Sequence, residues 1–80
     1  MYYVIQDTHI GIIQWAGIAE SESNALQKFA ADIRQDLSEI DNNDLEITEI
    51  PQSLYKEMGG DDIDGQDQRA INLLEEYKQQ

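Results

Sequence analysis

The chain has 80 residues, of which seventeen are Asp or Glu and five are Lys or Arg, so its formal net charge at pH 7 is −12. This length suits a single domain, residues 1–80, with little spare apolar surface for an enclosed catalytic pocket. The absence of cysteine excludes disulfides, thiolate metal sites and cysteine nucleophiles. The negative charge argues against direct binding to nucleic acid or to an anionic membrane, since both would repel the chain.

We expect neither a signal peptide nor a membrane span, because the chain opens Met-Tyr-Tyr-Val without a basic region and contains no long apolar run. Small secreted domains are commonly stapled by disulfides, so a chain without cysteine favours a reducing compartment. The expected protein is therefore soluble and cytoplasmic.

The first elements along the chain predict a β-hairpin. Residues 2–6 and 10–18 are rich in β-branched and aromatic side chains, and the polar turn between them, residues 7–9, is short. Strict alternation along the second strand would place Ile13 and Trp15 on the same face. Both faces of that strand carry apolar groups, so we expect Trp15 to lie under a helix or in an interface.

A helix is predicted near residues 21–38. Ser21 suits the N-cap position, and apolar residues then recur at steps of three and four. The stripe consists of Leu26, Phe29, Ala30, Ile33, Leu37 and Ile40. This spacing is typical of an amphipathic helix that packs its apolar side on a sheet.

The second half predicts one more strand and two helices. Residues 45–50 alternate apolar and polar side chains, and Pro51 ends that strand. A short helix over residues 52–58 precedes a diglycine break, and a final helix is expected near residues 66–78. The predicted fold class is therefore α+β: a small three-stranded antiparallel sheet in ββαβ order, covered on one face and packed by one long helix, plus a C-terminal helix.

Negative charge is concentrated in the second half of the chain. Residues 1–40 carry a net charge of −4, whereas residues 41–80 carry −8. The densest stretch, residues 39–67, holds ten acids against Lys56 alone. Solubility needs a net charge magnitude of only about 2–8, so we favour a binding role for the charge over a purely solubilising one.

Outward carboxylates spaced like nucleic-acid phosphates can compete for a groove lined by Lys and Arg. We expect the third strand to present Asp44 and Glu46 on a solvent face, with the patch continuing through the diglycine loop. The candidate partner-binding residues are Asp44, Glu46, Glu49, Glu57, Asp61, Asp62, Asp64 and Asp67.

Clustered carboxylates in residues 60–67 raise the question of calcium binding. Aligning Gly65 with the turn glycine of an EF-hand places Gly60 and Ile71 at the first and last ligand positions, so two essential ligands are missing. The simpler interpretation is a solvated loop that caps the final helix. The lone His9 has no nucleophile or second histidine beside it in the pattern, so we predict no enzyme activity, no metal and no cofactor.

In its size, its charge and its predicted ββαβ opening, the chain resembles the small acidic proteins that phages and mobile elements direct against host defence. These include anti-CRISPR and anti-restriction proteins, many of which are DNA mimics. The segment WAGIAESESNAL, residues 15–26, is also similar to the strand-to-helix step of HicB-type antitoxin domains.

The leading hypothesis is a small inhibitor or adaptor that docks on a basic protein surface of a nucleic-acid-binding protein, with DNA mimicry as its specific form. The alternative is an antitoxin-like or homodimeric interaction module that uses an apolar sheet surface. Calcium binding by residues 60–67 comes third.

Overall fold

The computed structural model describes residues 1–80 and has an α+β architecture built on a three-stranded antiparallel sheet. The strands are β1 (Tyr2–Asp7), β2 (Ile13–Ile18) and β3 (Leu45–Ile50), and the helices are α1 (Glu22–Asp32), α2 (Gln52–Met58) and α3 (Gln68–Lys78). Single 3₁₀ turns occur at Leu37–Glu39, Asn42–Asp44 and Gly60–Asp62. None of the helices combines the length and the apolar character needed to cross a membrane.

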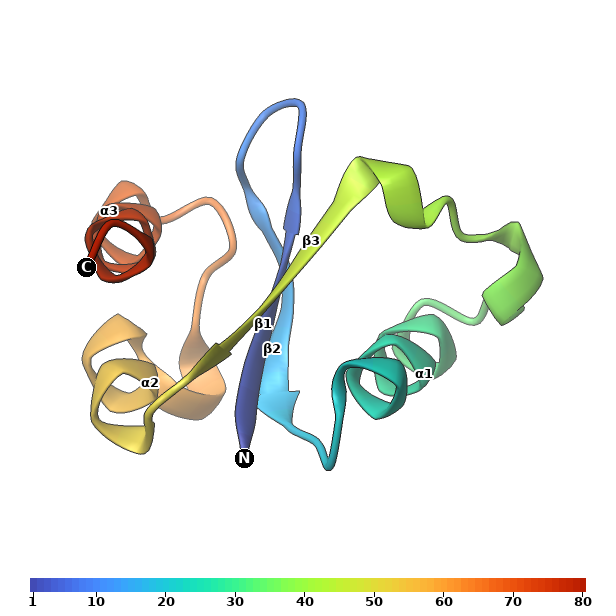
Figure 1. The fold of residues 1–80 in the computed structure, drawn as a ribbon, viewed down its shortest axis with the longest axis horizontal. Coiled ribbons are helices and arrows are strands. Elements are labelled where there is room, and N and C mark those ends of the chain that lie inside the picture. The colour runs from blue at the N-terminus through green and yellow to red at the C-terminus, as the bar shows by residue number, and fades with distance from the viewer.

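β1 is the central strand, because the strand order is β2-β1-β3 and both neighbours run antiparallel to it (Figure 1). Its side chains from Tyr3 to Gln6 are all buried, and Val4 and Ile5 have no exposed surface. Successive strand residues point to opposite faces, so a strand buried at consecutive positions must be covered on both sides. The expectation of a sheet covered on one face is therefore wrong.

Helices lie on both faces of the sheet, which makes three layers (Figure 1). α1 packs on one face, around a core of Tyr3, Ile5, Ala19, Ala25, Leu26 and Phe29. α2 and α3 together cover the other face, around a core of Val4, Ile13, Ile50, Tyr55, Met58, Ala70 and Leu74. In place of one long helix, α1 and α3 have 11 residues each and lie on opposite faces.

The hairpin turn is longer than predicted, and β2 begins at Ile13 rather than at residue 10. The Asp7 side chain accepts hydrogen bonds from the backbone N–H groups of His9 and Ile10, at 2.7 and 3.2 Å. Within the same turn, Gly11 adopts a left-handed φ of 77°. Turns of this kind favour aspartate at their first position, where its side chain bonds to the backbone, and glycine where φ is positive. Ile10 therefore lies in the turn, with 69% of its surface exposed.

A β-bulge changes which side chains of β2 share a face. Gln6 pairs with Ile13 and Ile5 pairs with Trp15, which leaves Gln14 as an extra, exposed residue. Ile13 consequently lies in the core under α2 and α3, whereas Trp15 packs with Ile5 on the α1 side. The prediction that Ile13 and Trp15 share a face is wrong, because a bulge interrupts the period-two alternation.

α1 begins where the sequence predicts and ends earlier. The Ser21 side chain accepts a first-turn backbone N–H at 3.1 Å, which confirms the predicted N-cap. The helix stops at Asp32 rather than near residue 38, and Arg34 adopts a left-handed φ of 57°, a conformation common where helices end. The chain then turns back toward β3, which leaves Ile33 and Leu37 of the predicted apolar stripe exposed.

Candidate functional site

The eight predicted partner-binding residues do not form one surface. Glu46 and Glu49 lie on β3 but on opposite faces of the sheet: Glu46 pairs with Gln6, on the side of α2 and α3, and Glu49 pairs with Tyr3, on the side of α1. Asp44 directly precedes the strand. The other five follow one another through α2, the last 3₁₀ turn and the loop before α3. This acidic segment consists of Glu57, Asp61, Asp62, Asp64 and Asp67.

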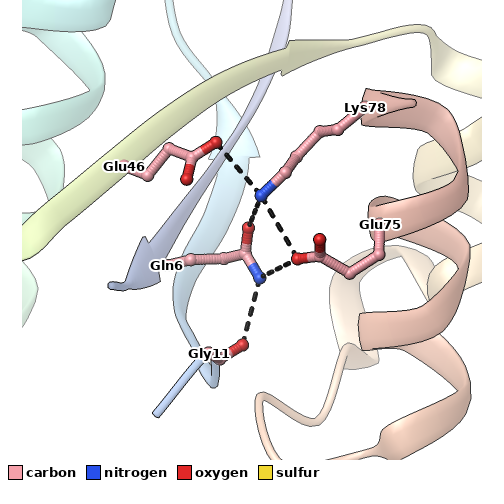
Figure 2. A network of polar contacts seen from close by, with 5 residues as sticks. All are labelled: Gln6, Gly11, Glu46, Glu75 and Lys78. Carbon is pink, nitrogen blue, oxygen red and sulfur yellow. Dashed lines mark hydrogen bonds and ion pairs between the residues drawn. The ribbon is translucent and has the colours of Figure 1, made fainter. Parts of the chain in front are cut away.

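Glu46 belongs to a polar network that joins β3 to α3 (Figure 2). Its Oε1 lies 3.0 Å from Nζ of Lys78, on the last turn of α3. The same ammonium donates hydrogen bonds to Glu75 at 3.2 Å and to the side-chain oxygen of Gln6 at 2.9 Å. The predicted solvent face of β3 is thus the face on which α3 packs, and the charge of Glu46 is matched there by Lys78.

Gln6 stands at the centre of this network and is the one buried polar residue, with 2% of its surface exposed. Its Nε2 donates to the carbonyl oxygen of Gly11 at 3.0 Å and to Oε1 of Glu75 at 3.3 Å, while its oxygen accepts from Lys78. No buried side-chain nitrogen or oxygen in the protein lacks a partner. A fully satisfied buried amide of this kind specifies how α3 sits on the sheet.

The network also sets the protonation of its charged groups. Hydrogen bonds from Lys78 and Gln6 lower the pKa of Glu75. Burial alone would lower the pKa of Lys78, but hydrogen bonds to Glu46 and Glu75 outweigh burial and raise the pKa. Both shifts favour the charged forms, whereas general acid–base catalysis needs a group whose pKa is moved toward neutrality. The network therefore stabilises the packing of α3 on β1 and β3.

Asp44 pairs with the only histidine. Nε2 of His9 lies 2.8 Å from Oδ1 of Asp44, and this contact joins the first hairpin turn to the start of β3. The hydrogen bond with Asp44 raises the pKa of His9, and the negative charges of Asp44 and Asp7 raise it further. The histidine side chain is 72% exposed, so the pair is a surface contact rather than a buried catalytic dyad.

The acidic segment combines an anchored backbone with unpaired charge. Asp61 accepts a hydrogen bond from the hydroxyl of Tyr55 at 3.1 Å, and burial together with this bond raises the pKa of Tyr55 to about 12. The side chains of Asp64 and Asp67 each accept a hydrogen bond from the backbone N–H of the residue two positions later, at 2.9 and 3.0 Å. Asp67 is the N-cap of α3, which confirms the predicted capping role of this loop. None of the five carboxylates forms an ion pair.

The carboxylates of residues 60–67 do not converge on a cation site. No group of three or more His, Asp or Glu side chains in the protein is placed to hold a metal ion. Calcium requires several oxygen ligands around one point, and Asp64 and Asp67 are turned to backbone N–H groups instead.

The two larger hollows on the surface are shallow. One, of about 300 Å³, lies between α2 and α3 and is lined in part by Leu54, Leu73 and Tyr77. The other, of about 560 Å³, lies where β2 leads into α1 and is lined in part by Ile18 and Lys28.

Sequence reasoning missed Gln6, Glu75 and Lys78. One feature of the sequence could have indicated Gln6: it is a glutamine near the end of an otherwise apolar strand. A polar side chain that points into the core must form hydrogen bonds there. Glu75 and Lys78 are three positions apart on α3, a spacing that brings side chains together on a helix. Nothing in the spacing, however, indicates that both meet Gln6.

Neither a comparison with protein-family models nor searches of curated proteins and of solved structures found a match to this chain.

Proposed function

We propose that this protein is a small inhibitor or adaptor that docks its acidic segment on a Lys- and Arg-rich surface of a nucleic-acid-handling protein. The observation that carries the proposal is the excess of unpaired carboxylates: of seventeen acidic residues, only Asp44, Glu46 and Glu75 pair with a basic side chain. The net charge of −12 exceeds the magnitude of about 2–8 that keeps a small domain soluble. Unpaired surface charge steers a protein toward surfaces of opposite sign.

The acidic segment is the part of the molecule best suited to this contact. It holds five acids within residues 57–67 and no basic residue. Because Asp61, Asp64 and Asp67 accept hydrogen bonds from the protein itself, their positions are already restricted before binding, which lowers the entropy cost of association. A restricted array of negative charges suits a groove that otherwise holds a phosphate backbone.

The most specific form of the proposal is a DNA mimic that acts in counter-defence, like the anti-CRISPR and anti-restriction proteins that the chain resembles in size and charge. Its mechanism would be electrostatic attraction to the nucleic-acid-binding groove, followed by steric occlusion of that groove. The absence of cysteine fits a reducing, cytoplasmic place of action.

Affinity capture from the native host, followed by a salt titration of the purified complex, tests the electrostatic part of the proposal. We expect affinity to fall as salt rises, because salt screens interactions between exposed charges. An affinity that stays constant from low to high salt would contradict it.

A pair of charge-matched variants tests the place of contact. The variant that neutralises the acidic segment carries Glu57→Gln, Asp61→Asn and Asp62→Asn, and its control carries Glu20→Gln, Asp36→Asn and Glu39→Gln. All six residues are exposed and none forms an ion pair. The first variant should weaken the complex by about tenfold or more and the control only slightly. Equal losses would show that net charge, and not this segment, determines binding.

An antitoxin-like or homodimeric module is the second candidate, and the open edge of the sheet favours it. β2 is an edge strand, and Ile18 and the neighbouring Met1 are each 58% exposed. Apolar side chains beside a strand edge that is only partly paired favour pairing with another chain. Size-exclusion chromatography and the fluorescence of Trp15 separate the two candidates, since a homodimer would elute at twice the monomer mass without any basic partner.

A further inference from the structure

The groove between α2 and α3 is lined by one stripe from each helix. α2 contributes Ser53, Leu54 and Glu57, α3 contributes Leu73, Glu76 and Tyr77, and Pro51 and Gln80 complete the lining. Residues three and four positions apart lie on one face of a helix, so each helix turns both an apolar and an acidic side chain toward the groove. The groove has a volume of about 300 Å³, which is enough to receive an apolar side chain from a partner.

The apolar lining of the groove is incompletely covered. Leu54, Leu73 and Tyr77 are half-buried and pack at the border of the core that contains Met58 and Leu74. Each therefore keeps apolar surface that a partner side chain would remove from water. Burying such surface contributes roughly 25 cal/mol per Å² of apolar area, whereas exposed ion pairs contribute little by themselves.

The acidic side chains of the groove have no cation to neutralise them. Glu57 and Glu76 form no ion pair, and no basic residue lines the groove. Lys78, two positions after Glu76, is held in the network of Figure 2 on another side of α3. Lys56 neighbours Glu57 in sequence but is not part of the lining. The groove is thus apolar and negatively charged at once.

We propose that this groove binds a cationic amphipathic segment of the partner, with an apolar side chain placed between Leu54 and Leu73 and with lysine or arginine beside Glu57 and Glu76. The inference rests on the proposed function and deepens it by naming the chemistry of the partner surface. The groove is complementary to positive charge around an apolar anchor, so it calls for an apolar side chain in addition to the basic residues of the proposed partner surface. A helix with apolar residues at steps of three and four and basic residues between them has this pattern.

The larger hollow beside β2 lacks this complementarity and provides an internal control surface. Its lining includes Lys28, whose Nζ donates to the carbonyl oxygen of Ile18 at 2.7 Å. Because Glu20 and Lys28 both line this hollow, it has no excess of negative charge to attract a cationic segment, and peptide binding there would shift the amide signals around β2 instead of those of α2 and α3.

Nuclear magnetic resonance titration of the ¹⁵N-labelled protein tests the inference. The probe is a short synthetic peptide with leucines at helical spacing and lysines between them. One matched peptide replaces every leucine with alanine, and a second replaces every lysine with glutamine. We expect the probe to shift the amide signals of α2 and α3 around the groove, and each matched peptide to bind at least about fivefold more weakly.

The double variant Glu57→Gln, Glu76→Gln should weaken probe binding by about fivefold to tenfold, and the control Glu20→Gln, Asp36→Asn by less than about twofold. Signal shifts confined to residues 60–67 would overturn the groove and leave the proposed electrostatic docking intact, whereas shifts confined to the hollow beside β2 would overturn both. Equal binding of the alanine peptide would overturn the apolar anchor. No binding of any lysine-containing peptide at low salt would overturn both the groove and the proposed function.

Discussion

The side-chain oxygen of Gln6 accepts a hydrogen bond from Nζ of Lys78 at 2.9 Å, across a sequence separation of 72 residues (Figure 2). This bond ties the central strand to the last turn of α3. The same amide also donates to Gly11 in the hairpin turn and to Glu75. One buried side chain therefore holds the first hairpin, the sheet and the last helix together, and it sets the position of the helix that forms one wall of the groove.

Gln6→Ala should lower the free energy of unfolding by about 2–3 kcal/mol, because it removes three hydrogen bonds from a buried site and leaves a cavity. Gln27→Ala, an exposed change on α1, should alter stability by less than about 0.5 kcal/mol. Urea denaturation measures both variants. A loss for Gln6→Ala no larger than that of the control would mean that the network contributes nothing to holding α3.

The contact between His9 and Asp44 should make part of the stability depend on pH. Because the hydrogen bond to Asp44 raises the folded pKa of His9, the contribution is complete below the ordinary pKa of 6.5 and is lost as pH rises through the higher folded value. His9→Ala should therefore be more destabilising at about pH 5.5 than at about pH 9. The protein has one histidine, so its ring resonances report the pKa directly. Asp44→Asn should lower that pKa, and a wild-type pKa at or below 6.5 would count against the contact.

Gly65 brings the acidic segment into close approach with the edge of β2. Its carbonyl oxygen accepts the backbone N–H of Ile13 at 2.9 Å, and a Cβ added at Gly65 would overlap the Ile13 carbonyl oxygen. Gly65→Ala should cost about 1–3 kcal/mol, because one of the two backbones must move. Gln66→Ala, at an exposed neighbouring position, should stay within about 0.5 kcal/mol of wild type. Thermal unfolding compares them, and indistinguishable midpoints would refute the close approach.

Trp15 on β2 is joined to α1 by a hydrogen bond: its indole N–H donates to Oδ2 of Asp32 at 2.8 Å. Asp32→Ala should lower the free energy of unfolding by about 1 kcal/mol and shift the tryptophan emission to longer wavelength, since the indole then bonds to water. Asp32→Asn retains an acceptor and should preserve most of both properties. Asp36→Ala, beyond the end of the helix, should change neither. An emission spectrum unaffected by Asp32→Ala would show that the bond does not persist in solution.

The fold was predictable where it depends on local pattern. Alternation indicated the third strand, the spacing of Leu26 and Phe29 indicated α1, and Ser21 marked its start. The sequence pattern gave wrong predictions where the structure depends on contacts between residues that are far apart in the chain. Three features follow from packing: the extra residue Gln14 in β2, the early end of α1 at Asp32, and the second covered face of the sheet. The periodicity of a segment does not indicate which distant segment will pack against it.

By itself the sequence determined the α+β composition, the large negative charge and its concentration in the second half, because these depend only on residue types and their order. Tertiary structure decided which carboxylates remain unpaired. Five basic residues could have met any of seventeen acids, yet only Lys78 and the single histidine form ion pairs. It also brought Glu57 and Glu76 into the lining of one groove, since charges on two helices are juxtaposed only when the helices pack.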